Sequence, residues 1–345
     1  MRSSPARRRR RADGDGRDAR GSVRDLFVIQ NPAAGWRSPG RLSRRIASAL
    51  DAEGVKHRVV HTRGPGHAAD LARGALADGV RRILVAGGDG TVLEVVSALA
   101  GSEAALAVLP VGTGNQLAAN LRVPRGLRPA IEVAIRGDVR SIDVGWIDGR
   151  AFTCMAGAGF DAEVVRPGWR AKRRLGYLAY LYAAARTLIS PPRADLRVVI
   201  DGLEIRCRGM GVEVANMPGL SAPGFPRPVR VVPGGRLDDG RLDVCILGFE
   251  SRTDLVRALV SILTGRAGRD PRLRYHRGRE IRVETRPALQ VQADGERFGI
   301  TPFTAVVQHG ALSVVVPDRA SPSAGRTVEA SAGRASRRRT SEAEQ

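Results

Sequence analysis

The sequence predicts two domains of different classes, an N-terminal doubly wound α/β domain over residues 23–140 and a C-terminal antiparallel β-sandwich domain over residues 141–305. In the first part, apolar strands alternate with helical patterns, which is typical of a parallel sheet covered by helices. In the second part, short runs rich in valine, isoleucine and leucine alternate with glycine, aspartate and proline turns, which is typical of a sandwich. A length of 345 residues also favours two hydrophobic cores over one.

The first part alternates strands and helices along its whole length. The expected elements, in order, are the strand Leu26–Ile29, the helix Pro39–Glu53, the strand Lys56–His61, the helix His67–Ala77, the strand Ile83–Ala86, a helix with Val92, Val95, Val96 and Leu99, the strand Ala105–Leu109 and a helix that runs to about Asn120. Glycine with asparagine, threonine or aspartate follows each of the four strands. Because ligands of such sheets bind outside the carboxyl ends of the strands, we expect a binding site there.

The turn Gly87-Gly88-Asp89-Gly90-Thr91 links the third strand to its helix. A strand, a glycine turn and a helix together form a geometry that binds phosphate, because free N–H groups at the start of the helix point at the anion and glycine lets it approach. A polyphosphate repels Asp89 unless a cation or a hydroxyl substrate lies between them. Asp89 is therefore expected to be a Mg²⁺ partner or a proton acceptor; the alternative is a tight turn with a solvated aspartate.

The second part is expected to consist mainly of short strands. These are Ser141–Trp146, Leu196–Ile200, Gly211–Ala215, Leu242–Leu247, Arg279–Glu284, Leu289–Ala293, Ala305–Val307 and Leu312–Val316. Two helices interrupt them, one near Arg173–Ile189 and one near Arg252–Leu263. The sequence shows no internal repeat.

Basic residues dominate the charge of the chain, which has a formal net charge of +21. Residues 1–22 contribute +5 and residues 319–345 contribute +3, and both segments are expected to be disordered tails. The remaining +13 on residues 23–318 favours anionic partners: a nucleotide, a nucleic acid or an acidic membrane surface. No nucleic-acid module and no stacking aromatics accompany the basic residues, so no specific nucleic acid is expected.

The cysteines and the apolar runs indicate where the protein is expected to work. The three cysteines, Cys154, Cys207 and Cys245, are far apart, which fits a reducing cytoplasm. No secretory signal is visible, and no run approaches the ~20 apolar residues that span a bilayer. The basic cluster Trp169–Arg174 and the apolar run Leu175–Ile189 are expected to border a lipid pocket or to lie at the inner membrane surface. The alternative is a helix buried against the sandwich.

Several motifs occur together in a fixed order, and together they resemble the diacylglycerol kinase catalytic-domain family, which includes bacterial lipid kinases and sphingosine kinases. They are Asn31-Pro32-x-x-Gly35, Thr62 with Gly66-His67-Ala68, Gly87-Gly88-Asp89-Gly90-Thr91 with Glu94, Pro110-x-Gly112-Thr113-Gly114-Asn115, Gly157-x-Gly159-Phe160-Asp161, Asp238-Asp239-Gly240 and Asp294-Gly295-Glu296. The resemblance covers about residues 23–318. It implies ATP-dependent phosphorylation of a lipid hydroxyl, with ATP between the two domains and with residues 306–318 returning to the first domain.

The resemblance also implies roles for individual residues. ATP and its phosphates would be bound by Asn31, Thr62, Gly87, Gly88, Asp89, Gly90, Thr91, Glu94, Gly112, Thr113 and Asn115. Mg²⁺ is expected on the ATP near Asp89, because phosphoryl transfer needs charge neutralisation. Asp294 and Glu296 lie in one turn, and a carboxylate there can accept the proton of the substrate hydroxyl or bind a metal, so both are catalytic candidates. Glu296 is expected to be the general base, and Asp89 is the rival for that role.

Two further acids have roles implied by the resemblance. Asp161 is expected to meet the hydroxyls of the lipid head, with a helix-capping aspartate as the alternative. Asp239, with the main-chain carbonyls of Arg236 and Arg241, is expected to bind a structural Mg²⁺, with an ordinary hairpin turn as the alternative. Leu93 and Gln116 depart from the residues usual in the family, asparagine and aspartate.

The expected function is that of an ATP-dependent lipid kinase acting on a diacylglycerol-like or sphingoid lipid. Two other hypotheses remain open: an NAD-kinase-like phosphotransferase, and a basic protein that binds lipid or nucleic acid without turnover. The expected partners are the lipid substrate and, transiently, an anionic membrane surface, and a homodimer also stays open. The sequence does not name the lipid.

Overall fold

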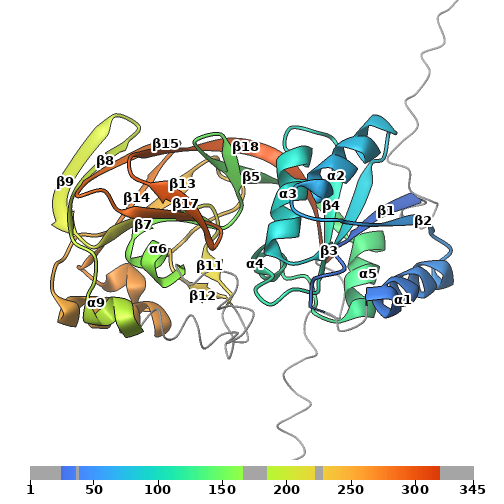
Figure 1. The fold of residues 1–345 in the computed structure, drawn as a ribbon, viewed down its shortest axis with the longest axis horizontal. Coiled ribbons are helices and arrows are strands. Elements are labelled where there is room, and N and C mark those ends of the chain that lie inside the picture. Colours follow the sequence, from blue (N-terminus) through green and yellow to red (C-terminus); the bar gives the residue numbers. More distant parts are fainter. Residues whose placement is uncertain (1–24, 36–38, 166–184, 222–227, 319–345) are drawn as a thin grey trace, which may run out of the picture.

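A computed structural model describes residues 25–35, 39–165, 185–221 and 228–318 of the chain. Both predicted tails and the basic cluster Trp169–Arg174 lie outside the described residues. The same holds for most of the predicted helix Arg173–Ile189, of which only residues 185–189 are described, as helix. No described helix is long and apolar enough to cross a membrane. The molecule has two lobes, an α/β lobe and a β-rich lobe (Figure 1).

The first lobe is built on four parallel strands in the order β2-β1-β3-β4. Their bounds are β1 Asp25–Gln30, β2 Lys56–His61, β3 Arg82–Gly87 and β4 Ala105–Pro110. The helices are α1 (Pro39–Ala52), α2 (His67–Ala77), α3 (Asp89–Leu99), α4 (Gln116–Asn120) and α5 (Leu127–Arg136). Figure 1 shows α2 and α3 on one face of the sheet and α1 and α5 on the other, so the predicted doubly wound class is confirmed.

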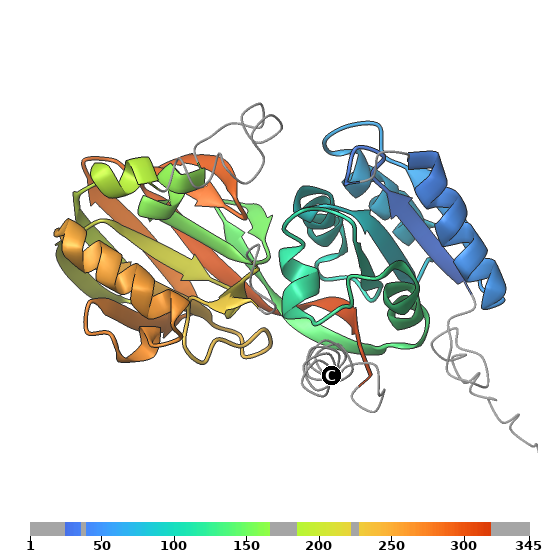
Figure 2. The ribbon, with the colours of Figure 1, turned by 90° about the horizontal axis from the view of Figure 1, so that it is seen from below.

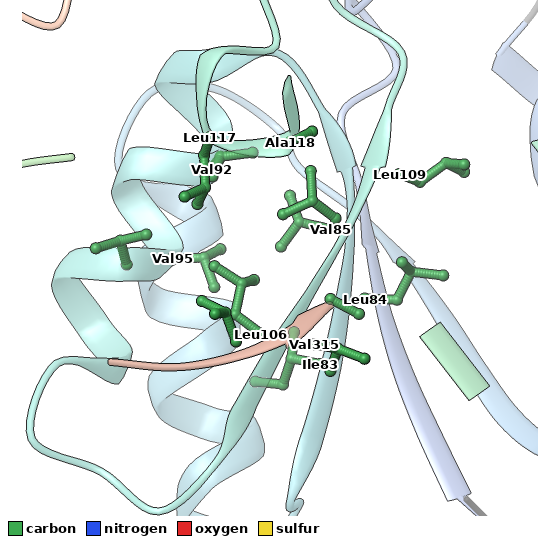
Figure 3. Packing of buried hydrophobic residues seen from close by; sticks show 14 of the residues in the cluster. Ile83, Leu84, Val85, Val92, Val95, Leu106, Leu109, Leu117, Ala118 and Val315 are labelled. Carbon is green, nitrogen blue, oxygen red and sulfur yellow. The ribbon is translucent and has the colours of Figure 1, made fainter. Parts of the chain in front are cut away.

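The core of this lobe explains why the sequence adopts this arrangement. All six residues of β3 and of β4 are buried, as continuous apolar runs in a parallel sheet require. Val92 and Val95 of α3 are spaced so that both face the sheet, and they pack toward Val85 and Leu106 (Figure 3).

One long strand, β18 (Phe303–Val316), joins the two lobes. Near its end it pairs in parallel with β4 of the first lobe, Ser313 opposite Ala105, and near its start it pairs with β15 (Glu280–Arg286) of the second lobe. The sequence predicted two separate short strands here. The prediction was wrong because Gln308, His309 and Gly310 break the apolar pattern while the strand continues, with shifted pairing to β5 (Asp138–Ile147).

The second lobe is a sandwich of two sheets, as predicted. One sheet has the order β14-β13-β10-β7-β16-β17, and the strands β5, β6, β18, β15, β8 and β9 form the facing layer. The bounds not yet given are β6 Arg150–Phe152, β7 Met155–Gly159, β8 Ala194–Ile200, β9 Leu203–Gly209, β10 Gly211–Ala215, β13 Leu242–Leu247, β14 Leu273–Gly278, β16 Gln290–Ala293 and β17 Glu296–Ile300. Buried side chains from both layers, such as Val214 and Val283, form the core between them.

Smaller elements cover the outer face of the six-stranded sheet and link it to the first lobe. The helices α6 (Phe160–Val165) and α9 (Arg252–Leu263) lie over the six-stranded sheet (Figure 2). Leu255 and Ala258 of α9 belong to an apolar cluster with residues of α6, β13 and β14. The short strands β11 (Gly219–Leu220) and β12 (Val229–Arg230) pair with each other, and the 3-10 helix Ala267–Arg269 follows α9. The predicted bounds of α9 are confirmed.

Candidate active site

A cleft of about 990 Å³ lies between the loops of the first lobe and the edge of the second. Among its lining residues are nine of those predicted as site residues: Asn31, Thr62, Gly88, Gly90, Thr91, Glu94, Gly112, Thr113 and Glu296. The first eight come from the loops that follow the parallel strands and from the first half of α3. Glu296 comes from the second lobe. The fold therefore brings most of the predicted phosphate-binding residues and the predicted base to one cleft.

Glycines let the loops after three strands approach one another closely. Gly112 lies so near the loop after β3 that a β-carbon on it would come within 2.6 Å of the Gly88 α-carbon. Gly35 adopts a φ of +63°, and a β-carbon there would collide with the Val111 carbonyl oxygen. Only glycine satisfies both the backbone angle and the close approach at residue 35.

Side chains hold these loops in place. The amide of Asn31 donates to the Thr91 hydroxyl (2.8 Å), which joins the loop after β1 to the start of α3. The carboxylate of Glu94 on α3 accepts the N–H groups of Gly66 (2.8 Å) and Ala68 (3.0 Å) at the start of α2. Glu94 therefore caps a neighbouring helix and positions the loop that carries Thr62.

Asp89 is directed away from the cleft and toward the loop after β4. Its carboxylate accepts the N–H groups of Asn115 (2.9 Å) and Gln116 (2.6 Å), at the start of α4. Burial raises the pKa of Asp89, while these backbone hydrogen bonds act in the opposite direction. Asn115 has a φ of +50°, and its side chain exchanges hydrogen bonds with the backbone of Gly112. Asp89 and Asn115 thus shape the loop that presents Thr113.

Asp294 and Glu296 share a hairpin turn but have different environments. Asp294 is half-buried, and its carboxylate accepts four hydrogen bonds from Thr153, Cys154 and Met155, where the chain passes from β6 into β7. Burial raises the pKa of Asp294, and the backbone hydrogen bonds oppose that rise. Asp294 and Gly295 both have positive φ, the geometry of a tight hairpin turn. Asp294 therefore anchors the turn that carries the exposed Glu296 into the cleft.

Asp161 is half-buried in the second lobe and is connected to this turn. The Gln292 side chain donates to the Asp161 carboxylate (2.6 Å) and accepts the N–H of Gly295 (2.9 Å). Burial raises the pKa of Asp161 to about 6, and the hydrogen bond from Gln292 lowers it. Asp161 is therefore one side chain away from the turn that holds Glu296.

Asp239 has the contacts of an ion pair. Its carboxylate accepts the N–H of Arg241 (3.2 Å) and lies 3.5 Å from the guanidinium of Arg277. The side chain of Arg236 pairs with Asp238. Within the described part of the chain, no group of three or more histidine, cysteine or acidic side chains could hold a metal ion. These contacts do not favour a Mg²⁺ ion at this loop, and the assignment stays a prediction.

Several functional candidates were not predicted as site residues. Arg63 and Arg150 bring positive charge to the cleft, and Trp146 adds an aromatic ring. The Arg150 guanidinium lies 4.0 Å from the Glu296 carboxylate. The only signal in the sequence was the position of Arg63 next to Thr62 and of Arg150 in a glycine turn, Asp148-Gly149-Arg150. Neither pattern is specific enough to have identified a site residue.

Gln116, one of the two departures from the resembled family, links the lobes. Its amide donates to the Ser221 carbonyl oxygen (2.9 Å) and accepts the Ser221 N–H (2.7 Å). Asn120 adds a hydrogen bond to the Gly219 carbonyl oxygen (2.9 Å). Leu93, the other departure, lies in the lining of the cleft.

Comparisons with known proteins agree with this architecture. Residues 25–147 match the model of the diacylglycerol kinase catalytic domain, and residues 154–316 match that of the YegS C-terminal NAD kinase beta sandwich-like domain. The fold and the matched catalytic domain define a kinase. The chain belongs to the diacylglycerol kinase catalytic-domain family, together with proteins named as YegS-like lipid kinases.

Individual relatives cover most of the chain. A diacylglycerol kinase of Bacillus subtilis is 29% identical over 297 residues, which are 84% of this chain and 95% of that protein. A Pseudomonas aeruginosa protein named "Probable lipid kinase YegS-like" is 32% identical over 278 residues, 79% of this chain and 89% of its own length. The crystal structure of a diacylglycerol kinase from Bacillus anthracis has a TM-score of 0.70 at 24% identity, covers 87% of this chain and 98% of its own, and supports the fold.

Proposed function

We propose that this protein transfers the γ-phosphoryl group of ATP to a free hydroxyl of a diacylglycerol-like or sphingoid lipid. One observation carries the proposal: a carboxylate of the second lobe faces the predicted phosphate-binding loops across the cleft. The Oε1 atom of Glu296 lies 3.5 Å from the position that a β-carbon would take on Gly90. That position is at the start of α3, where backbone N–H groups and the helix dipole favour a phosphate.

ATP would lie along the loops of the first lobe. Asn31, Thr62, Thr91 and Thr113 supply hydroxyl and amide groups there, and the glycines leave the backbone N–H groups accessible. Arg63 and Arg150 would offset part of the negative charge on the phosphates. Mg²⁺ bound to the ATP would neutralise further charge during the transfer.

Glu296 is the better candidate for the general base. Its side chain is exposed in the cleft, where an acceptor hydroxyl could reach it. Both oxygens of Asp89 instead accept backbone N–H groups of the loop after β4. We therefore propose Glu296 as the residue that takes the proton and Asp89 as a positioning residue for the phosphate-binding loops.

We also propose that α9 contacts an anionic membrane surface. Val256, Val260 and Leu263 are exposed large apolar side chains at helical spacing. The exposed basic residues around them are Arg252, Arg257, Arg266 and Arg269. An apolar stripe flanked by arginines fits the interface of an anionic bilayer. A peripheral position at the inner membrane surface would bring the second lobe to its lipid substrate.

A labelling experiment tests the proposed function. The protein is incubated with γ-labelled ATP, Mg²⁺ and a total lipid extract, and with NAD in a parallel reaction. We expect label in a lipid that separates by chromatography, and none in NAD. Labelled NAD, or no labelled product from any lipid, would contradict the proposal.

A further inference from the structure

Gln116, at the start of α4, makes a contact between the two lobes that the proposed function does not use. The residue is half-buried and is not among the described residues that line the cleft. Its side-chain amide donates to the carbonyl oxygen of Ser221 (2.9 Å) and accepts the N–H of the same residue (2.7 Å). Two residues that exchange both hydrogen bonds in this way are paired as in an antiparallel sheet. Gln116 therefore fixes both the distance and the orientation of Ser221.

A second side chain of α4 binds the same extended segment. Gly219 and Ser221 are alternate residues, so their backbone groups point to the same edge of an extended chain. Asn120 donates to the Gly219 carbonyl oxygen (2.9 Å), beside the pair that Gln116 makes with Ser221. The strand β12 pairs with β11. Three hydrogen bonds from α4 thus hold residues 219–221 of the second lobe in one register.

The backbone of Gln116 is held by the glycine turn at the start of α3. Its N–H donates to the Asp89 carboxylate (2.6 Å). Gly114 leaves room for this carboxylate, because a β-carbon there would come within 2.5 Å of an Asp89 oxygen. Gln116 is therefore bound through its backbone to the turn of the first lobe and through its side chain to the second lobe.

Hydrogen bonds in the second lobe lead from this contact to the turn that carries Glu296. The segment that ends at Ser221 begins at Asn216, whose N–H donates to the Cys154 carbonyl oxygen (2.9 Å). The N–H of Cys154 donates to the Asp294 carboxylate (2.8 Å), in the same turn as Glu296. A change in the position of residues 219–221 against α4 would therefore move Glu296 relative to the loops of the first lobe.

We propose that Gln116 is a positioning residue, which sets the second lobe against the phosphate-binding loops so that Glu296 and the acceptor hydroxyl meet the γ-phosphate of ATP. This inference rests on the proposed function, because it concerns the alignment on which phosphoryl transfer depends. An aspartate, which the resembled family usually has at this position, is shorter and has no donor for the Ser221 carbonyl oxygen. The pairing of the two lobes therefore requires the glutamine of this chain.

Two variants of the full chain test the inference on lipid dispersed in detergent. Gln116→Leu removes both hydrogen bonds at similar size, and Ser221→Ala is the matched control, since it keeps the backbone groups that Gln116 binds. We expect the kcat of Gln116→Leu to fall at least about tenfold, because a misplacement of about 1 Å can reduce the rate about a hundredfold. The KM for ATP should stay within about twofold, because the loops of the first lobe remain in place. Ser221→Ala should match the parent protein in both constants.

Hydrogen exchange measures the contact itself. The Ser221 N–H should exchange about tenfold faster in Gln116→Leu than in the parent protein, the size of one lost hydrogen bond. The variant should still fold, because β18 continues through both lobes. If it does not fold, Gln116→Glu decides, since it keeps the acceptor, loses the donor and should lose part of the kcat. Unchanged exchange at Ser221, an unchanged kcat, a KM for ATP that rises as kcat falls, or an equal loss in Ser221→Ala would each overturn the inference.

Failure of the proposed function would look different. The parent protein itself would then phosphorylate no lipid, and the inference would fall with the function, although Ser221 would still exchange faster in Gln116→Leu. The inference alone fails when the parent protein phosphorylates lipid and Gln116→Leu does so at the same rate.

Discussion

Asp89 shows how a residue in a glycine-rich turn can act through its neighbours. The sequence predicted its place beside the phosphates, since the glycine turn after an apolar strand defines that position. The sequence could not predict that both carboxylate oxygens accept N–H groups of Asn115 and Gln116, because those residues are far away along the chain. The role of Asp89 therefore depends on the approach of two loops, which only the folded sheet creates.

Asp89→Asn should impair both stability and transfer. An asparagine amide can accept only one of the two N–H groups, and its own NH₂ would face the other. The loss of one partly buried hydrogen bond to a charged group should lower the free energy of unfolding by about 1–3 kcal/mol. We expect a lower kcat and a raised KM for ATP, measured beside the exposed control Asp70→Asn. If the kinetics and the melting temperature stay unchanged, Asp89 does not position the phosphate-binding loops.

Asp161 should make stability depend on pH. Burial raises its pKa to about 6 from an ordinary 3.8, so the folded protein holds this proton more tightly than the unfolded chain. Stability from this group is therefore full below pH 3.8 and is lost as the pH rises to about 6. Asp161→Asn keeps an acceptor for Gln292 and removes the negative charge from this half-buried position.

The melting temperature of Asp161→Asn should exceed that of the parent protein at pH 7.5, and the difference should vanish near pH 4. The shift corresponds to at most about 3 kcal/mol. Asp25→Asn, at an exposed position at the start of β1, is the control for a general charge effect. Equal melting temperatures at pH 7.5 would contradict a raised pKa of Asp161.

At the scale of elements, the periodicity of apolar residues predicted the helices and strands that have a regular apolar pattern. It missed the strands that lack one. The helices α1, α2 and α9 and the strands β10 and β13 have clear patterns and lie where they were expected. The strand β7 has the sequence MAGAG, in which glycine and alanine give no strand signal. The strands β9 and β14 contain two arginines each, and tertiary pairing makes them strands.

The exposed face of α9 should determine binding to vesicles. Val260→Glu places a negative charge in the apolar stripe, where it would meet anionic headgroups. We expect at least tenfold weaker sedimentation with vesicles rich in phosphatidylglycerol, and unchanged turnover of lipid dispersed in detergent. Leu203→Glu, at an exposed apolar position on β9, is the matched control. Equal vesicle binding by both variants would contradict the proposal that α9 contacts the membrane.

At the scale of the whole molecule, the site depends on the joining of the lobes. The strand β18 continues one sheet through both of them, and the link from Gln116 to Ser221 adds a second connection. The sequence predicted the loops on one side of the cleft and the acidic turn on the other. It could not predict the hydrogen bond from Gln292 to Asp161, because these residues are far apart along the chain and only the folded sheet brings them together.

The terminal segments should be dispensable for chemistry. Residues 1–22 and 319–345 are rich in arginine, serine, glycine and alanine and have few large apolar side chains to bury. A chain truncated to residues 22–318 should keep the melting temperature and the turnover of detergent-dispersed lipid. Circular dichroism measures the melting temperature, and the labelling assay measures the turnover. Loss of folding on truncation would contradict the prediction that the terminal segments lie outside the two domains.

The rate of lipid phosphorylation by Glu296→Gln, beside that of the parent protein, tests the account most directly. The acceptor is an alcohol, so proton removal by a positioned carboxylate should contribute about 10²–10⁴-fold to the transfer. Glutamine keeps the size of the side chain but cannot take the proton. We predict a labelled lipid from the parent protein, a fall in kcat of at least a hundredfold in Glu296→Gln, and a nearly unchanged KM for ATP. A Glu296→Gln that retains near-full kcat on the same lipid would contradict the account.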